Sequence, residues 1–299
     1  MNKVTVIGGG VLGSQIALVC AYHGLDTWIW LRSPASIDRA KPKLKKAFEE
    51  IMADIERADG DPARLPAGLQ EPDITTKKAK EKARRALESV HLELNLEKAL
   101  AGADIVIESM SEDPKAKAEM YAAMAPLLTK DQILVTNSST LLPSMFADMT
   151  GCPERYLALH FANHIWRNNL TEVMAQPKTD PEVFDEVMTF ARSISMDPVA
   201  VRKERSGYLL NSMLVPFLFS AMDLLVTGTG DVKDIDKAWV KGAGAPYGPF
   251  RMLDTIGLET ARNIAHNFAA IPEEMASFHY RDLERMLTEK IDRKEKFWD

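Results

Sequence analysis

Short apolar runs alternate with amphipathic stretches through the first 200 residues of the chain. The apolar runs predict strands at 3–7, 26–31, 90–94, 104–108, 132–136, 155–160, 170–174 and 198–201. Apolar positions at helical spacing predict helices after residue 10, at 36–58, 76–88, 96–100 and 114–128, and from Pro181 onward. This alternation predicts an α/β fold with a doubly wound, mostly parallel sheet.

After about residue 203 the apolar pattern becomes purely helical, and it is clearest at 206–227, 231–242 and 257–268. A turn-rich link at 242–249 separates the last two of these helices. The helices predicted between residues 36 and 88 form an insertion that interrupts the simple alternation. We therefore predict a first domain of residues 1–200, with this helical insertion at about 36–88, and an all-helical domain of residues 201–299.

A glycine cluster joins the first predicted strand to the first predicted helix. Gly8, Gly10 and Gly13 match G-x-G-x-x-G in the strand–turn–helix context that this motif requires. The first glycine permits the tight turn, the second lets the backbone approach a pyrophosphate, and the third lets the helix pack close to the strand. The helix N-terminus adds unpaired N–H groups and a positive dipole end. The sequence therefore predicts a Rossmann-like dinucleotide site that also includes Val11 and Leu12.

The second predicted strand ends at Leu31 without the acidic residue that usually bonds the adenosine ribose in this architecture. Arg32 and Ser33 follow instead. An arginine beside a hydroxyl pairs with a 2′-phosphate, which a carboxylate would repel. This predicts a preference for NADP(H) over NAD(H). In the alternative interpretation Arg32 stacks on the adenine or points to solvent, and NAD(H) is used.

The composition is that of an ordinary globular protein and narrows the choice of partners. A net charge of −6 and the lack of a Lys/Arg stripe argue against nucleic acid. Polar residues and a proline interrupt the most apolar stretch, 208–226, which favours a buried helix over a membrane span. Cys20 and Cys152 indicate neither a disulfide framework nor a metal site. Because the first strand starts at residue 3, no signal peptide is expected, and we predict a cytoplasmic protein.

Polar groups are predicted at or near the strand ends where ligands bind in such sheets. Asn137, Ser138 and Ser139 follow the strand at 132–136, and His160 closes the strand at 155–160. Glu172 lies in a strand that can return antiparallel beside His160, and such a His–Glu pair is a good general base. For His160 alone, a satisfied structural histidine is the alternative. No pair of His, Cys or carboxylate residues shows metal-ligand spacing, so no metal is predicted.

Together these motifs resemble those of the L-3-hydroxyacyl-CoA dehydrogenases over essentially the whole chain. The similar segments are 8–13, Val106-Ile107-Glu108 with Glu112 and Lys117, Asn137-Ser138-Ser139, 159–163, 171–173, 206–211 and 242–250. The resemblance implies that His160 is the acid/base, that Glu172 is its partner, and that Ser139 and Asn211 hydrogen-bond the reacting oxygen.

The resemblance also implies that Glu108, Lys117 and Asn137 lie along the nicotinamide half of the cofactor. The insertion would help to hold coenzyme A, and the helical domain would form a homodimer. The implied reaction is the interconversion of (S)-3-hydroxyacyl-CoA and 3-ketoacyl-CoA by hydride transfer, a step of fatty acid metabolism.

The segment after the predicted catalytic histidine departs from the family pattern, which usually reads Phe-Phe-Asn-Pro. Here His164 takes the place of the proline, and Trp166 and Arg167 follow. His164 is either a polar group of the substrate pocket or a plain loop residue. This departure leaves open the same chemistry on a free hydroxy acid, such as a sugar acid or a carnitine-like compound. A non-catalytic crystallin-like or cofactor-sensing protein is a more remote alternative. The presence of all four polar residues of the expected site argues against it, namely Ser139, His160, Glu172 and Asn211.

Overall fold

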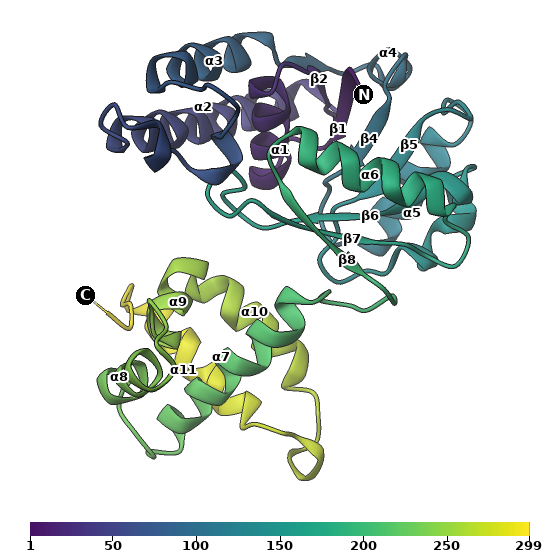
Figure 1. The fold of residues 1–299 in the computed structure, drawn as a ribbon. Helices are drawn as coiled ribbons and strands as arrows, with labels where there is room; N and C mark the ends of the chain where they lie inside the picture. The colour runs from purple at the N-terminus through teal and green to yellow at the C-terminus, as the bar shows by residue number, and fades with distance from the viewer. Residues whose placement is uncertain (299) are drawn as a thin grey trace. The chain divides into compact units, whose positions relative to one another are not determined.

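A computed structural model describes residues 1–298, which form two compact units divided between Tyr208 and Leu209. Figure 1 shows a unit of strands and helices followed along the chain by a unit of helices alone. The predicted domain boundary, near residue 200, lies inside the last strand of the first unit.

The first unit is built on one eight-stranded sheet. Its strands are β1 (Lys3–Ile7), β2 (Asp26–Trp30), β3 (His91–Glu93), β4 (Ile105–Glu108), β5 (Ile133–Thr136), β6 (Tyr156–Phe161), β7 (Leu170–Met174) and β8 (Asp197–Val201). Their order across the sheet is β3-β2-β1-β4-β5-β6-β7-β8, and only β6 and β7 are antiparallel neighbours. The predicted doubly wound, mostly parallel sheet is confirmed.

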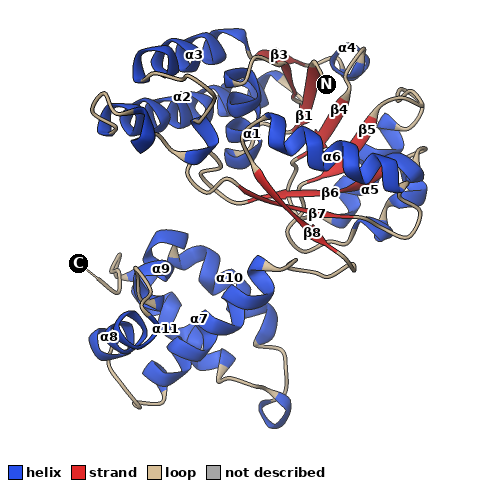
Figure 2. Ribbon diagram, in the orientation of Figure 1, coloured by secondary structure: helices blue, strands red, loops and turns tan. Residues whose placement is uncertain are grey.

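Helices cover both faces of this sheet (Figure 2). They are α1 (Val11–Tyr22), α2 (Pro34–Arg57), α3 (Thr76–Ser89), α4 (Leu96–Leu100), α5 (Pro114–Met124) and α6 (Pro181–Ser193). Side chains alternate along β1, so Val4 and Val6 join the core beneath α1, α2, α3 and α6, whereas Ile7 joins the core beneath α4 and α5. Adjacent residues of β4 and β5, such as Val106 and Ile107, divide between the same two cores, so β1, β4 and β5 are covered on both sides, which explains their nearly continuous apolar runs.

The predicted helical insertion is present as α2 and α3, which pack against α1. Two short 3₁₀ turns, η1 (Pro62–Arg64) and η2 (Ala67–Leu69), lie between them. Gly68 in η2 contacts the segment that follows β6, where a Cβ on this glycine would lie 2.7 Å from Trp166 Cα. The Gly68 N–H also donates to the Trp166 carbonyl at 2.9 Å. The insertion is thereby joined to the segment between His160 and Glu172.

The second unit contains α7 (Leu210–Val226), α8 (Val232–Ala243), α9 (Pro249–Ile256), α10 (Leu258–Phe268) and α11 (Tyr280–Asp292). Its core includes Met222, Phe250 and Leu283, each 0% exposed. No helix among residues 1–298 combines the length and the apolar character needed to cross a lipid bilayer.

Several helix bounds differ from the sequence prediction. The helix predicted from residue 206 begins at Leu210, because Gly207 and Tyr208 have φ of +80° and +52°, which a helix does not accommodate. The helix predicted to end at residue 128 ends at Met124. Neither α9 nor α11 was predicted, although Tyr280, Leu283 and Leu287 repeat at helical spacing in α11.

Candidate active site

The turn between β1 and α1 has the backbone shape that the glycine motif predicts. Gly8 has φ of +110°, a conformation that other residues rarely adopt. A Cβ on Gly13 would lie 2.1 Å from the Gly8 carbonyl oxygen, so the helix can begin this close to the strand only without a side chain there. A Cβ on Gly10 would meet no protein atom within 4 Å, so open space adjoins the Gly10 backbone.

The first turn of α1 is suited to hold a pyrophosphate. No side chain caps this helix at Gly10, and Val11 is 59% exposed. The turn follows the carboxyl end of β1, which lies in the sheet between β2 and β4. Dinucleotides bind at this edge of such sheets, with phosphates against the N–H groups of the following helix. The exposed helix start and the open space beside Gly10 therefore fit a dinucleotide.

Arginine and serine side chains gather where β2 leads into α2. Arg32 is exposed, and Ser33 is the N-cap residue of α2. The Ser33 and Ser36 hydroxyl oxygens are 2.9 Å apart, and Arg39 Nη2 donates to Ser36 Oγ at 2.8 Å. Arg39 was missed by the sequence analysis, although its three-residue spacing from Ser36 places both on one helix face. This end of α2 combines hydroxyl donors, two guanidinium groups and a positive dipole end, which favours an anion.

A carboxylate stands at the end of the neighbouring strand β3. Glu93 Oε1 accepts hydrogen bonds from the N–H groups of Leu94 and Asn95, both at 2.9 Å, and Glu93 Oε2 pairs with Lys98. The Lys98 ammonium and these N–H groups lower the pKa of Glu93 to about 2. Glu93 is therefore charged at neutral pH, with its charge compensated locally.

His160 and Glu172 face each other across the antiparallel strands β6 and β7. The register pairs the two residues directly, and His160 Nδ1 lies 3.0 Å from Glu172 Oε2. The other ring nitrogen, Nε2, lies 3.2 Å from Ser139 Oγ. His160 is 5% exposed and Glu172 is 1% exposed. A carboxylate at Nδ1 keeps the proton on that nitrogen, which leaves Nε2 free to accept one.

The loop that carries Ser139 is held by contacts from two other segments. The Ser139 N–H and the Ser138 hydroxyl both donate to the Glu112 carboxylate, each at 2.5 Å. The Gly207 N–H donates to the Ser139 carbonyl at 3.2 Å. The sequence pattern alone had assigned Glu112 no role. These contacts fix the backbone from which the Ser139 hydroxyl reaches His160.

Glu108 and Lys117 form an ion pair inside the protein. Lys117 Nζ lies 2.6 and 2.7 Å from the two oxygens of the Glu108 carboxylate. Tyr121 and Thr136 donate their hydroxyls to the same carboxylate at 2.8 and 2.7 Å. Both charged side chains are 0% exposed, so in this conformation they join β4, α5 and β5 rather than line a surface. Their role along the nicotinamide stays a prediction.

Asn137 and Asn211 lie in different units of the chain. The Asn137 side-chain oxygen accepts the Phe161 N–H at 2.9 Å, which ties the loop after β5 to the strand end beside His160. Asn211 lies on α7 in the helical unit. Its role at the reacting oxygen, and that of Asn137 along the cofactor, also stay predictions.

The segment after His160 is anchored to α2. Trp166 is 0% exposed, and its indole N–H donates to Asp54 Oδ2 at 2.7 Å. Arg167 pairs with the same buried carboxylate. Trp166 is thus a core residue, and the positive charge of Arg167 is compensated. His164 stays half-buried, with Nε2 3.5 Å from Glu50 Oε2 and a φ of +56°.

Comparison with known proteins covers both units. The family model for "3-hydroxyacyl-CoA dehydrogenase, NAD binding domain" matches residues 3–205, and the model for "3-hydroxyacyl-CoA dehydrogenase, C-terminal domain" matches residues 207–296. The chain belongs to the 3-hydroxyacyl-CoA dehydrogenase family. The family resemblance inferred from the sequence is confirmed, and this 3-hydroxyacyl-CoA dehydrogenase family member is an oxidoreductase with a nicotinamide cofactor.

Individual relatives agree with this membership. The 3-hydroxybutyryl-CoA dehydrogenase of Mycobacterium tuberculosis (strain ATCC 25618 / H37Rv) is 30% identical, over 94% of this chain and 90% of the relative. The mitochondrial hydroxyacyl-coenzyme A dehydrogenase of Rattus norvegicus is 29% identical, over 93% of this chain and 83% of the relative. A solved diketoreductase, described by its dual catalysis of dicarbonyl compounds, is 39% identical with a TM-score of 0.84, over 100% of this chain and 98% of that one.

Proposed function

We propose that this enzyme interconverts (S)-3-hydroxyacyl-CoA and 3-ketoacyl-CoA, with His160 as the acid/base. The observation that carries the proposal is the pair of contacts at the imidazole, with Glu172 at Nδ1 and Ser139 at Nε2. Family membership supports the substrate class.

In the oxidative direction, Nε2 of His160 takes the proton of the substrate hydroxyl. Glu172 stabilises the imidazolium that forms, because its carboxylate lies 3.0 Å from Nδ1. The Ser139 hydroxyl donates a hydrogen bond to the reacting oxygen and keeps it in line. The bound nicotinamide supplies the hydride acceptor in oxidation and the hydride donor in reduction.

In the reductive direction, His160 starts protonated and gives its Nε2 proton to the oxygen of the forming alcohol. The glycine turn at Gly8, Gly10 and Gly13, with Val11 and Leu12 at the start of α1, would hold the dinucleotide. For Asn211 as a second donor to the reacting oxygen, the support is the family resemblance alone.

NADP(H) is the proposed cofactor. Arg32 and Ser33, with Ser36 and Arg39 beside them, offer charge-assisted hydrogen bonds to a 2′-phosphate at the start of α2. Glu93 opposes this preference, because it keeps a negative charge on the neighbouring strand. We give the arginines more weight, since Lys98 already compensates that charge.

A free dicarbonyl or hydroxy acid substrate is the second candidate. The diketoreductase at 39% identity supports it, because the description of that protein names dicarbonyl compounds. The departure at His164 supports it too, since this half-buried residue replaces the proline that the family pattern has just after the strand of His160. The chemistry at His160 would be the same.

The first experiment is to follow NADPH and NADH oxidation separately, with acetoacetyl-CoA and with a free dicarbonyl compound as acceptors. We expect turnover of acetoacetyl-CoA that is faster with NADPH, because Arg32 pairs with the 2′-phosphate. Turnover of the free dicarbonyl alone would select the second candidate. No turnover of either acceptor, in protein that binds a dinucleotide, would contradict both.

The Arg32→Ala variant tests the cofactor preference independently of the proposed acid/base chemistry. Removing one charge-assisted contact of about 1.5–3 kcal/mol is expected to lower kcat/KM for NADPH about 10- to 150-fold and to leave kcat/KM for NADH unchanged. The surface variant Arg64→Ala, in η1, is the matched control. Equal losses of kcat/KM with both cofactors would mean that Arg32 does not recognise the 2′-phosphate.

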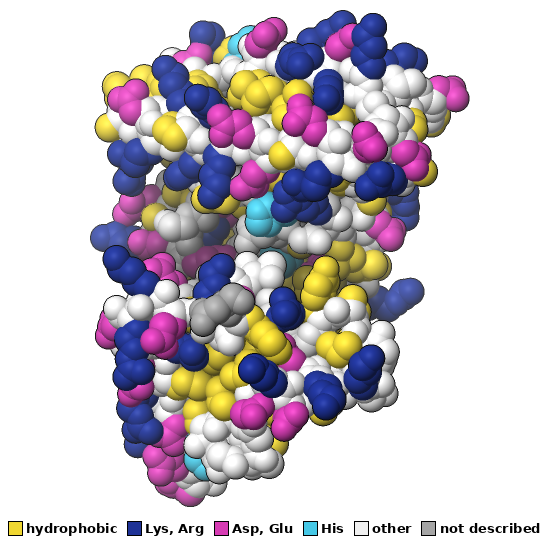
Figure 3. Space-filling view, turned by 90° about the vertical axis from the view of Figure 1, so that its left-hand side faces the viewer, with side chains coloured by type: hydrophobic (Ala, Val, Ile, Leu, Met, Phe, Trp, Pro, Cys, Tyr) yellow, Lys and Arg dark blue, Asp and Glu magenta, His cyan; other side chains and the backbone are white. Residues whose placement is uncertain are grey.

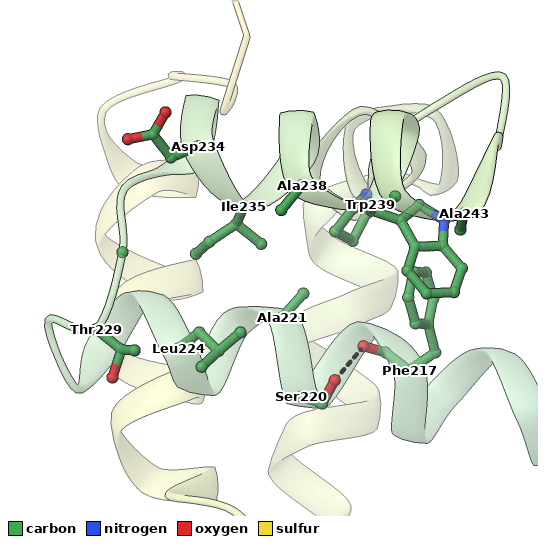
Figure 4. Close-up of a pocket in the computed structure, with 13 residues that line it drawn as sticks. Phe217, Ser220, Ala221, Leu224, Thr229, Asp234, Ile235, Ala238, Trp239 and Ala243 are labelled. Carbon is green, nitrogen blue, oxygen red and sulfur yellow. Dashed lines mark hydrogen bonds between the residues drawn. The ribbon is translucent and has the colours of Figure 1, made fainter.

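The helical unit is proposed to form a homodimer. A groove of about 690 Å³ runs between α7 and α8, and Figure 4 shows Phe217 and Leu224 of α7 across from Ile235 and Trp239 of α8. Leu224 is 41% and Trp239 is 39% exposed. Hydrophobic side chains also form a patch on this unit in the space-filling view (Figure 3). Such patches mark association surfaces in proteins.

Sedimentation equilibrium tests the dimer. Wild-type protein is expected at twice the chain mass of 33.3 kDa, and Leu224→Glu is expected to shift it toward one chain mass, because a carboxylate would be buried in the interface. Met275→Glu, at a 75% exposed position outside the groove, is the control. A dimer that tolerates Leu224→Glu would place the interface elsewhere.

The cytoplasm is the proposed compartment. Cys20 and Cys152 are free and buried. Burial raises the pKa of Cys20 to about 12 and also raises the pKa of Cys152, so neither thiol is reactive at neutral pH. Buried free thiols support a reducing compartment.

A further inference from the structure

Tyr208 contacts the proposed acid/base on a side that Glu172 and Ser139 do not reach. Its ring stacks on the His160 imidazole with centroids 4.5 Å apart and planes inclined by only 10°. Glu172 and Ser139 contact the two ring nitrogens, in the directions of the imidazole plane. The nitrogen contacts set where those atoms lie, and the stacked ring limits how far the imidazole tilts.

The hydroxyl of Tyr208 is anchored at the same loop that carries Ser139. It donates to the Ser138 carbonyl at 2.7 Å, and the preceding residue, Gly207, donates its N–H to the Ser139 carbonyl at 3.2 Å. Two consecutive residues at the end of the first unit therefore hold two consecutive carbonyls of the loop. The Tyr208 side chain thus contacts His160 and the residue that precedes Ser139.

The backbone conformation of Tyr208 is unusual for a residue with only a packing role. Its φ is +52°, a conformation that few residues other than glycine, asparagine and aspartate adopt. Its side chain is 1% exposed. Burial raises the pKa of Tyr208 far above its usual range, so the phenol stays protonated and its hydroxyl remains a donor to Ser138. Strained backbone at such a position is typical of functional sites.

We propose that Tyr208 is a positioning residue for the reaction, and this inference rests on the proposed role of His160. Its ring keeps the imidazole plane in line with the substrate oxygen, and its hydroxyl keeps the Ser139 loop against Nε2. Tyr208 itself neither gives nor takes a proton. It acts through His160 and Ser139.

Two substitutions distinguish the effect of the Tyr208 ring on kcat from the effect of its hydroxyl. Tyr208→Phe keeps the stacking surface and loses the bond to Ser138, and kcat is expected to fall about threefold. Tyr208→Leu loses both, and kcat is expected to fall about 30-fold, because a small misplacement of a catalytic group is costly. The KM for the dinucleotide and its Kd are expected to stay unchanged, since the Tyr208 ring contacts His160 and its hydroxyl contacts Ser138, both outside the glycine turn and α1. Circular dichroism and thermal melting are the measurements that test whether both variants fold.

A double-mutant cycle with His160→Ala tests the mechanism of the effect. If Tyr208 acts through the imidazole, Tyr208→Leu lowers kcat by less than threefold in the His160→Ala background. An equal 30-fold loss in both backgrounds, or wild-type kcat for Tyr208→Leu, would overturn the inference. Near-normal kcat for His160→Ala alone would instead overturn the proposed function, so the two failures are distinguishable.

Discussion

Replacement of His160 by alanine is expected to lower kcat about 10³-fold, because the site would lose its proposed proton acceptor in oxidation and its proposed proton donor in reduction. Steady-state assays in both directions measure this loss. Dinucleotide binding is expected to stay within about twofold of wild type, since the glycine turn and α1 follow β1, whereas His160 lies on β6. Fluorescence titration with the reduced cofactor measures that Kd.

The matched control for His160→Ala is His164→Ala. Both histidines lie in or just after β6, but the ring of His164 contacts Glu50 and is half-exposed rather than paired with Glu172. We expect His164→Ala to retain kcat within about threefold of wild type, as surface substitutions usually have small effects. If His160→Ala kept near-normal turnover, another group would have to carry the proton.

Introduction of a methyl group at Gly13 is expected to weaken dinucleotide binding at least about tenfold and to destabilise the fold by about 1–3 kcal/mol. The new Cβ would lie 2.1 Å from the Gly8 carbonyl oxygen, and both atoms belong to backbone that no rotamer change can move. Relief therefore requires that β1 and α1 separate at the turn that would hold the pyrophosphate. Urea denaturation and cofactor titration of Gly13→Ala measure the two effects.

Gly10→Ala is the control for that substitution. Gly10 has an ordinary φ of −67°, and a Cβ there would meet no protein atom within 4 Å. We expect this variant to have the stability of wild type and to bind the dinucleotide more weakly, because the methyl group would occupy the space beside the backbone. A Gly13→Ala protein with wild-type stability and affinity would show that the turn is more adaptable than its geometry indicates.

The sequence by itself determined the elements and the chemical type of the site. Apolar runs bounded by turns predict buried parallel strands, and the β1–α1 glycines predict the turn, because both signals are local and act within a few residues. The His160–Glu172 pair could also be anticipated, since only eleven residues of strand and loop, 161–171, separate the two and an antiparallel return places them opposite each other. Family membership followed from the same motifs.

Only the tertiary structure decided which side chains meet across elements distant in the chain. Tyr208 and Ser138 are 70 residues apart, and Trp166 and Asp54 are 112 residues apart. Neither pair leaves a periodic signal, because such contacts depend on how whole elements pack and on the direction of each side chain. Glu108 shows how packing can change the interpretation of a residue. A carboxylate at a strand end suggests a group that binds a ligand, yet in the fold Lys117, Tyr121 and Thr136 enclose it. The left-handed backbone conformation of Tyr208 is also a result of tertiary packing. In the fold, the Tyr208 ring stacks on the His160 imidazole.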